Sequence, residues 1–344
     1  MKYVTIIDIA RELGISKSTV SRALAGDAQN VKPETMKLVC ETARRMGYQR
    51  NETAVNLRRQ LSKTIGIVIP EAITSFFMNF IQCAQRDLRA QGYRTIIAVS
   101  NEDIVQEREC LQMLEQCRVD GILMCVCHSE ANSKMFRNVM SRGIPIVFFD
   151  RHVRDTAASQ VHLDDVTASV FMVEKLIRSG CRYIVHLLGP TYIGNAADRL
   201  HGYREVLEKF NLPYNPQYVV EGGLSAEEGA RAMERFIQTG LHFDAVFGFT
   251  ETAVLGAKSV LQRMHFRIPE DVSLCCMSGT ALCTLVHPTL SAAHQPTEEM
   301  AHTATRLLLE QLAHPDQFKP QTVVLPGEVV LRESTKPLPT LETV

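Results

Sequence analysis

Long hydrophobic runs are missing from this sequence of 344 residues: no stretch reaches the roughly 18 apolar residues that a membrane-spanning helix needs. The N-terminus, MKYVTIIDIARELG, also lacks the uninterrupted apolar core of a secretion signal, because acidic residues break it. We therefore expect a cytoplasmic protein without a membrane partner. Hydrophobic residues make up 45% and charged residues 22% of the chain, which excludes a disordered or fibrous protein.

Signatures of catalysis are missing as well. The sequence contains no G-x-S-x-G nucleophile turn, no phosphate-binding loop, no H-E-x-x-H motif and no glycine-rich dinucleotide turn. The ten cysteines of a chain without an export signal are expected to be free thiols. Cys125, Cys127 and His128 alone resemble a metal site, and no second pair at ligand spacing accompanies them. We expect no enzyme activity, no cofactor and no bound metal.

Charge is unevenly distributed, although the net charge is only -1. Residues 1–63 contain 12 Lys and Arg against 6 Asp and Glu, a balance of +6, whereas the remainder contains 25 against 32, a balance of -7. A basic segment attached to an acidic body is typical of a module that binds polyanions such as nucleic acid.

This basic segment predicts three short helices. Thr5 is a suitable cap for the first helix, which ends at Gly14. Ser16 caps a second helix over about residues 17–25, and Pro33 begins a third. Two helices joined by a tight turn, the second polar and basic outside, form a helix-turn-helix that can enter the major groove of DNA. A small three-helix bundle with a solvated basic face is the alternative.

The stretch Ile15-Ser16-Lys17-Ser18-Thr19-Val20-Ser21-Arg22 resembles the turn and recognition helix of the lactose-repressor (LacI/GalR) family of bacterial regulators. The resemblance implies that Lys17, Ser18 and Arg22 read bases, while Ser16, Thr19 and Ser21 contact phosphates or cap the helix. It also implies a hinge helix after the third helix. The expected DNA-binding set is Thr5, Ser16, Lys17, Ser18, Thr19, Ser21, Arg22, Asn51 and Leu57.

The predicted hinge lies in the segment QRNETAVNLRRQLSK. Asn51 can cap a helix of about eight residues, too short to be stable alone in water. In the resembled family the corresponding helix pairs with its twin and pushes a leucine, here Leu57, into the minor groove; such wedges bend the duplex. Arg50 stands where the family usually has proline, which makes the start of the hinge less rigid. A plain charged linker is the alternative.

From Thr64 the pattern changes to alternating strands and helices. Buried parallel strands are expected at 64–70, 94–100, 119–126, 144–150, 182–189, 243–250 and 272–277. Helical stretches separate them, around 165–179, 199–210, 225–239 and 252–264 among others. This predicts two doubly wound parallel-sheet lobes after the small all-α domain, with a ligand cleft between them. The expected domains are 1–49, a hinge at 50–63, a two-lobed effector-binding and dimerisation body at 64–335, and a tail at 336–344.

The body also resembles the family's effector-binding core, which is similar to periplasmic sugar-binding proteins. The matching motifs include 118–122, 143–145 with 149–151, 198–203, 268–272 and 331–335. The resemblance implies three crossings between the lobes, near residues 162, 291 and 321. It places four residues at the ligand: Phe77, Asp150, Arg199 and Glu251. Each has another interpretation, Phe77 as a core residue and Asp150 with Arg199 as a structural ion pair.

The chain departs from the family at two later ligand positions. Thr250-Glu251 replaces the usual Asn-Asp, and Ser278-Gly279 replaces a usual pair of carboxylates. Since ionised carboxylates accept hydrogen bonds from sugar hydroxyls, losing that pair argues against an ordinary neutral monosaccharide. An anionic, modified or larger ligand, and a core that senses nothing small, stay open.

Together these patterns predict a sequence-specific DNA-binding transcriptional regulator, a repressor that binds a pseudo-palindromic operator as a homodimer. Its partners would be double-stranded DNA, a second copy of the chain and a small-molecule effector such as a carbohydrate or a derivative. The alternative is a solute- or carbohydrate-binding protein that does not act on DNA.

Overall fold

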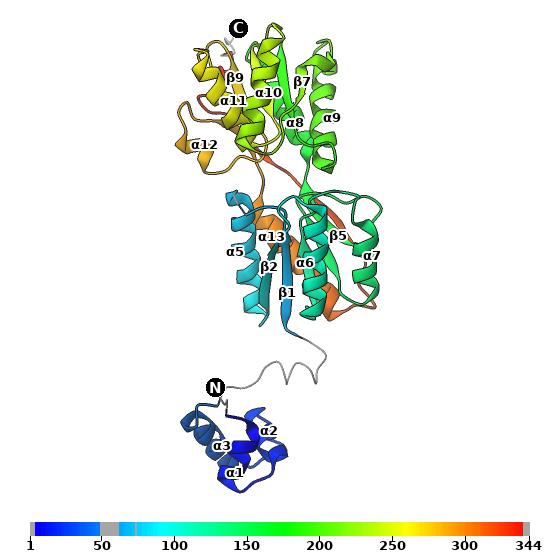
Figure 1. Cartoon of the computed structure of the whole chain (residues 1–344), viewed down its shortest axis with the longest axis vertical. Helices are drawn as coiled ribbons and strands as arrows, with labels where there is room; N and C mark the ends of the chain where they lie inside the picture. Colours follow the sequence, from blue (N-terminus) through cyan, green and yellow to red (C-terminus); the bar gives the residue numbers. More distant parts are fainter. Residues whose placement is uncertain (1–3, 49–61, 73, 340–344) are drawn as a thin grey trace, which may run out of the picture. The chain divides into compact units, whose positions relative to one another are not determined.

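The computed structural model describes residues 4–48, 62–72 and 74–339. The chain divides into two compact units, Met1–Ser62 and Lys63–Val344, shown as separate bodies in Figure 1. Asn51 and Leu57 lie outside the described residues, so the hinge helix stays a prediction. Within the described segments, each helix is too short or too polar to cross a lipid bilayer.

The first unit is a bundle of three helices. They are α1 (Ile6–Leu13), α2 (Lys17–Leu24) and α3 (Pro33–Arg45). Thr5 and Asp8 form the capping box at the start of α1. Gly14 ends α1 at φ 65°, a left-handed conformation that glycine adopts without strain. Ile9, Val20 and Val39, one from each helix, are fully buried and hold the bundle together.

The second unit contains two lobes, each built on a six-stranded sheet (Figure 1). In the first lobe the strand order is β11-β5-β4-β3-β1-β2, and the printed pairings are all parallel. Its strands are β1 (Thr64–Ile69), β2 (Arg94–Val99), β3 (Gly121–Met124), β4 (Ile146–Phe149), β5 (Ser159–Leu163) and β11 (Thr322–Leu325). Its helices are α5 (Ser75–Ala90), α6 (Ile104–Gln116), α7 (Ser133–Ser141) and α13 (Thr297–Ala313). Isoleucine, valine and phenylalanine side chains fill the core on both faces of this sheet.

In the second lobe the strand order is β12-β10-β9-β8-β6-β7. Its strands are β6 (Ile184–Leu188), β7 (Val219–Glu221), β8 (Ala245–Gly248), β9 (Ser273–Cys276), β10 (Ser291–His294) and β12 (Glu328–Val330). Its helices are α8 (Asp165–Arg178), α9 (Gly194–Lys209), the short 3-10 helix η1 (Pro216–Tyr218), α10 (Ala226–Gln238), α11 (Glu251–Arg263) and α12 (Leu282–Leu285). The strands β6, β8 and β9 are fully buried, as expected of parallel strands covered by helices on both faces.

The small helical domain followed by two sheet lobes confirms the predicted fold class, with three differences. Strand β12 pairs antiparallel with β10, so the second sheet is not wholly parallel. Helix α9 begins at Gly194, five residues before the predicted start. The three crossings between lobes occur at 164, 295–296 and 326–327, a few residues later than expected, because β5, β10 and β11 run to their carboxyl ends before the chain leaves the lobe.

Candidate DNA-binding surface and effector cleft

Helix α2 carries the residues predicted to read bases. Lys17, Ser18 and Arg22 are all exposed, while Val20 and Ala23 anchor the opposite face of the helix in the core. Because the apolar face is fixed in the bundle, the polar and basic face is held outward in a defined orientation. A helix with such a face fits the width of the B-DNA major groove.

Ser16 is the N-cap of α2. Its hydroxyl accepts a hydrogen bond from the backbone N–H of Thr19 at 3.1 Å and pairs with the hydroxyls of Ser18 and Thr19 at 2.7 and 2.8 Å. Three hydroxyl groups therefore gather at the start of the helix, where the partial positive charge of the helix also favours an anion such as a DNA phosphate. Ser21, one turn further along, is half-buried.

Thr5 has a structural task. Its hydroxyl donates to Asp8 Oδ2 at 2.7 Å, and its backbone N–H donates to the same oxygen at 2.9 Å. These bonds close the first turn of α1, although Thr5 itself is exposed. A contact of Thr5 with DNA stays a prediction.

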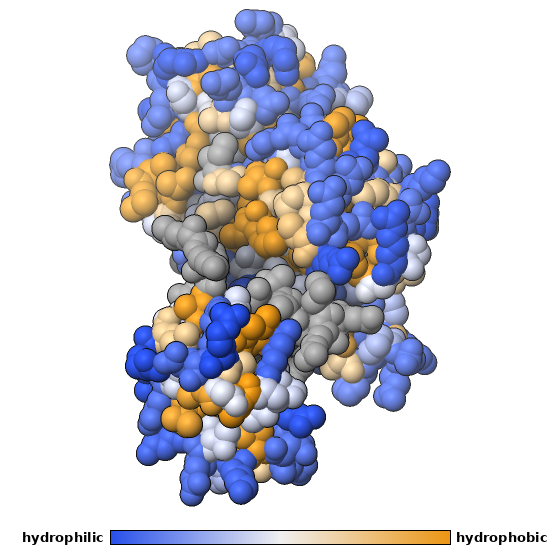
Figure 2. Space-filling model, turned by 60° about the horizontal axis from the view of Figure 1, so that its bottom comes forward, coloured by the Kyte–Doolittle hydropathy of each residue, from blue (hydrophilic) through white to orange (hydrophobic). Residues whose placement is uncertain are grey.

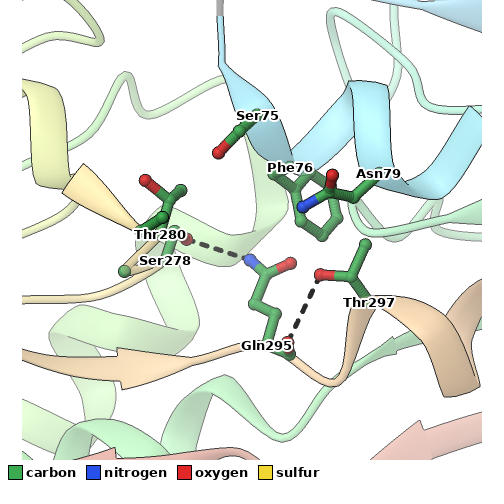
Figure 3. Close-up of a pocket in the computed structure, with 9 residues that line it drawn as sticks. Ser75, Phe76, Asn79, Ser278, Thr280, Gln295 and Thr297 are labelled. Atoms are coloured by element: carbon green, nitrogen blue, oxygen red, sulfur yellow. Dashed lines mark hydrogen bonds between the residues drawn. The ribbon is translucent and has the colours of Figure 1, made fainter. Parts of the chain in front are cut away.

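The two lobes of the second unit enclose a small cavity of about 50 Å³ (Figure 3). Three parts of the chain line it: the start of α5, the segment 278–281 after β9, and the link between β10 and α13. The lining side chains that Figure 3 labels are Ser75, Phe76, Asn79, Ser278, Thr280, Gln295 and Thr297. The cavity lies where the carboxyl ends of the parallel strands face each other, the usual ligand position in such sheets.

Of the two neighbouring phenylalanines on α5, Phe76 lines the cavity and Phe77 does not. Phe77 is 5% exposed and packs edge-on against Phe149 in the core of the first lobe, with ring centroids 6.5 Å apart. The edge of Phe76 contacts the Phe77 ring at 5.0 Å. Consecutive helical residues point about 100° apart, so only one of the two can face the cleft.

Arg199 of α9 is buried beneath the cleft and paired with Asp165 of α8. Its Nε donates to Asp165 Oδ1 at 2.6 Å, its Nη1 donates to the Phe249 carbonyl, and its Nη2 donates to Ser278 Oγ at 3.3 Å. Burial raises the pKa of Asp165 to about 6, and the opposing Arg199 charge limits that rise. An ion pair does exist at Arg199, but its partner is Asp165 rather than the expected Asp150.

Asp150 follows β4 directly and adopts a left-handed backbone conformation, with φ 63°. Its carboxylate is buried and accepts a hydrogen bond from the Cys125 thiol at 3.6 Å. Burial raises the pKa of Asp150, against the attraction of nearby Arg151 and Arg199. Its carbonyl oxygen accepts from the Asn195 side chain at 3.2 Å, which connects the first lobe to the second.

Glu251 is the first residue of α11 and is also buried. Its carboxylate accepts the backbone N–H of Thr280 at 3.2 Å, the Thr280 hydroxyl at 2.6 Å and the Cys283 thiol at 2.8 Å. The Glu251 side chain therefore shapes the cavity wall from behind, by fixing the segment that contains Thr280.

Further contacts connect the lobes outside the cavity. The Ser129 backbone N–H donates to the Tyr192 carbonyl at 3.1 Å, and the Gly194 N–H donates to the Ser129 hydroxyl at 2.9 Å. The rings of His128 and Tyr192 stack with centroids 5.2 Å apart. These bonds hold the lobes together in this conformation.

The three residues that resemble a metal site have separate partners. The Cys125 thiol faces Asp150, and the Cys127 backbone N–H donates to Glu107. His128 Nδ1 accepts the backbone N–H groups at 130 and 131. Among the described residues, no group of three or more potential ligands is arranged to hold a metal ion.

Sequence reasoning missed three polar residues of the cleft: Asn79, Asp165 and Gln295. Gln295 donates to Ser278 Oγ at 2.9 Å, and Figure 3 shows its amide oxygen turned away from Ser278, toward the side of Phe76 and Thr297. Asn79 lies three residues after Phe76 on α5, on the same face of that helix. This spacing was the available signal for Asn79, whereas the roles of Asp165 and Gln295 depend on contacts between distant elements.

Comparison with protein families separates the same two parts. Residues 5–51 match the model described as "Bacterial regulatory proteins, lacI family", and residues 173–335 match the model of a periplasmic binding protein-like domain. The chain is 27% identical to the ribose operon repressor of Halalkalibacterium halodurans, over 96% of this chain and 97% of the relative. It is 28% identical to catabolite control protein A of Priestia megaterium, over 97% and 99%.

Solved structures show the same arrangement. A complex of the transcriptional regulator CelR with cellobiose matches with a TM-score of 0.74 and 25% identity, over 96% of this chain and 99% of that one. The lac repressor dimer bound to operator and an anti-inducer matches in fold with a TM-score of 0.84 and 21% identity, over 98% and 100%.

A helix-turn-helix domain joined to a two-lobed, periplasmic-binding-protein-like body defines a class of bacterial DNA-binding regulators. This chain belongs to that class as a member of the lacI family of transcriptional regulators.

Proposed function

We propose that this protein is a cytoplasmic repressor that binds a pseudo-palindromic operator as a homodimer and responds to a small effector in the interlobe cleft. The observation that carries the proposal is the exposed Lys17, Ser18 and Arg22 face of α2, held by a buried core within a lacI-family domain. Lys17 and Arg22 would donate to guanine, and Ser18 would contact a base or a phosphate. Ser16, Thr19, Ser21 and the hinge residues Asn51 and Leu57 would contact the DNA backbone and the minor groove.

The dimer supplies the second half-site reader. Two-fold symmetry of the protein demands two related half-sites on the DNA, each read by one α2. Hydrophilic side chains cover much of the face in Figure 2, with hydrophobic ones between them. Leu282 and Leu285 of α12 are 46% and 77% exposed, and such exposed apolar side chains favour contact with another protein surface. We propose that α12 contributes to pairing with a second copy.

Effector binding would act through lobe closure. The Ser129, Tyr192 and Gly194 contacts that join the lobes can form only when the lobes are close, so a ligand that favours or opposes this closed form shifts the operator-binding population. Phe76, Asn79 and Gln295 would contact the ligand, with Asp150 nearby. Phe77, Arg199 and Glu251 would then support the cleft from behind rather than contact the effector.

Operator selection tests the proposal. Purified full-length protein is incubated with a random duplex library, bound fragments are sequenced, and the affinity of the selected fragment is measured against salt. We expect an inverted repeat, two chains per fragment, and log K falling by about 0.9 per phosphate neutralised. A monomer that binds every duplex equally, or none, would reject the operator-binding repressor and favour a solute-binding protein.

A further inference from the structure

We propose that the cleft accepts uncharged effectors and rejects phosphorylated or carboxylated ones, because both buried arginines beside it are already neutralised by carboxylates of this chain. The inference rests on the proposed effector function of the cleft. It also assigns Asp165 as the positioning residue that sets the charge selectivity.

Arg199 has no free donor direction toward a ligand anion. Asp165 takes its Nε, the Phe249 carbonyl takes one terminal nitrogen, and the Phe249 ring lies 4.3 Å from the guanidinium carbon. Arg199 and Asp165 are 2% and 3% exposed, so water does not screen the pair. The remaining nitrogen reaches the cavity only through the Ser278 hydroxyl, at 3.3 Å.

Arg151 is engaged in the same way. Its two terminal nitrogens donate to the two carboxylate oxygens of Glu102 at 2.6 and 2.8 Å, a bidentate pair. It also donates to the Val126 carbonyl at 3.1 Å. Neither arginine therefore offers a spare positive charge, and among the described residues the cavity lining itself contains no charged side chain.

The groups left without partners are hydrogen-bond acceptors. Asn195 Oδ1 and Gln295 Oε1 are buried and accept no printed hydrogen bond, and the Asp150 carboxylate has the Cys125 thiol as a weak donor. Buried acceptors are stabilised when a partner donates N–H or O–H groups to them. An uncharged ligand rich in such donors suits this set.

An anion would meet the opposite environment. Asp150 and Asp165 are both buried near the cleft, and an added phosphate or carboxylate would be repelled by them without a free cation to offset the repulsion. The anionic ligand that the sequence left open is therefore disfavoured by the paired arginines.

Charge-neutralising substitutions test the inference. Asp165→Asn keeps the size of the side chain but removes the charge that neutralises Arg199. Asp164→Asn is the matched control, because Asp164 caps α8 through the Thr167 N–H at 3.0 Å and asparagine is an equally good cap. Binding of inorganic phosphate, and of the pairs ribose with ribose 5-phosphate and glucose with glucose 6-phosphate, is measured by calorimetry on full-length protein.

We expect the wild type and Asp164→Asn to bind none of the anions, and Asp165→Asn to gain phosphate affinity by roughly tenfold or more. Phosphate binding to the wild type, or no gain in a folded Asp165→Asn variant, overturns the inference. Should Asp165→Asn fail to fold, the wild-type sugar pairs decide: binding of a neutral member alone supports the inference, and tighter binding of a phosphorylated member, or of neither, overturns it.

Operator binding is measured on the same preparations. Intact operator binding together with phosphate binding would reject only the charge selectivity. Loss of operator binding by the wild type would reject the proposed function itself.

Discussion

Gly256 of α11 lies directly against the carbonyl oxygen of Ala226 in α10, so that a β-carbon at position 256 would be 1.9 Å from that oxygen. The contact is reciprocal, since a β-carbon at Gly229 of α10 would lie 2.1 Å from the Ala253 carbonyl oxygen of α11. Two glycines thus let the backbones of α10 and α11 approach closely on one face of the second lobe. Both atoms met are backbone atoms, which cannot rotate away.

The substitution Gly256→Ala is expected to destabilise the second unit. Forcing the two helices apart should lower the free energy of unfolding by about 1–3 kcal/mol, the usual cost of overpacking. Denaturant unfolding followed by circular dichroism measures the change. Ser259→Ala is the control because Ser259 is exposed on the same helix. Equal stability of Gly256→Ala and the wild type would show that the helices separate freely.

Glu251→Gln tests whether Glu251 fixes the cavity wall. Glutamine has one acceptor oxygen where the carboxylate has two, so either the Thr280 hydroxyl or the donors at the other oxygen lose their partner. We expect a loss of about 1–3 kcal/mol in the free energy of unfolding and faster hydrogen exchange in residues 278–285.

The control for that substitution is Glu270→Gln. Glu270 is exposed on the same lobe, so neither stability nor exchange should change. Unaltered exchange at 278–285 in Glu251→Gln would mean that the segment holds its shape without Glu251.

The regular part of the fold follows from local sequence. Runs such as 64–70 and 243–250 are continuously apolar, and only a strand covered on both faces requires that pattern. The edge strands β7 and β12 have three residues each and no such run, and they are defined by the partner strand beside them. Helix α13 packs with α5 in the first lobe although it follows the second lobe in the chain, a position that periodicity cannot reveal.

The cleft was predictable in place but not in detail. The carboxyl ends of the strands locate it, and Asp150 after β4 belongs to that edge. The choice between Phe76 and Phe77 depends on the rotation of α5 about its axis, which neighbouring apolar residues leave undetermined. The partner of Arg199 depends on how α8 packs against α9, so Asp165 emerges only from the tertiary structure.

His186 is expected to make the protein sensitive to acid. It is fully buried between the rings of Tyr203 and Phe247, and burial lowers its pKa to about 4. Its Nδ1 lies 3.0 Å from the Phe247 carbonyl and so carries the proton of the neutral ring. In the unfolded chain the pKa is near 6.5, so between pH 6.5 and 4 the unfolded state binds the extra proton and the folded state does not.

Stability from this group is therefore complete above about pH 6.5 and falls as the pH drops toward 4, by about 3 kcal/mol in total. His186→Phe should flatten that part of the stability profile, measured by denaturant unfolding at several pH values. His201→Phe, at an exposed position of α9, should leave the acid-dependent loss as in the wild type. An equally steep profile in His186→Phe would assign the acid sensitivity to other groups.

Arg22→Ala tests the base-reading role of α2. Arg22 is exposed near the end of a helix whose opposite face is locked in the core, so its removal should leave the fold intact. If Arg22 donates to a guanine edge, its loss should cost about 1–3 kcal/mol on the selected operator and relax the preference at one position of each half-site. Fluorescence anisotropy with a set of single-base operator variants measures both effects.

Arg11→Ala provides the charge-matched comparison. Arg11 is exposed on α1 and lies 3.7 Å from Asp8, so it removes the same charge from the same unit without altering α2. It should change operator affinity little and leave the base preference untouched. A loss in Arg22→Ala that is equal on every duplex, with a salt slope smaller by about one unit, would instead assign Arg22 to a phosphate. The helix would then read sequence through Lys17 and Ser18, and the half-site would shift toward the N-terminal end of α2.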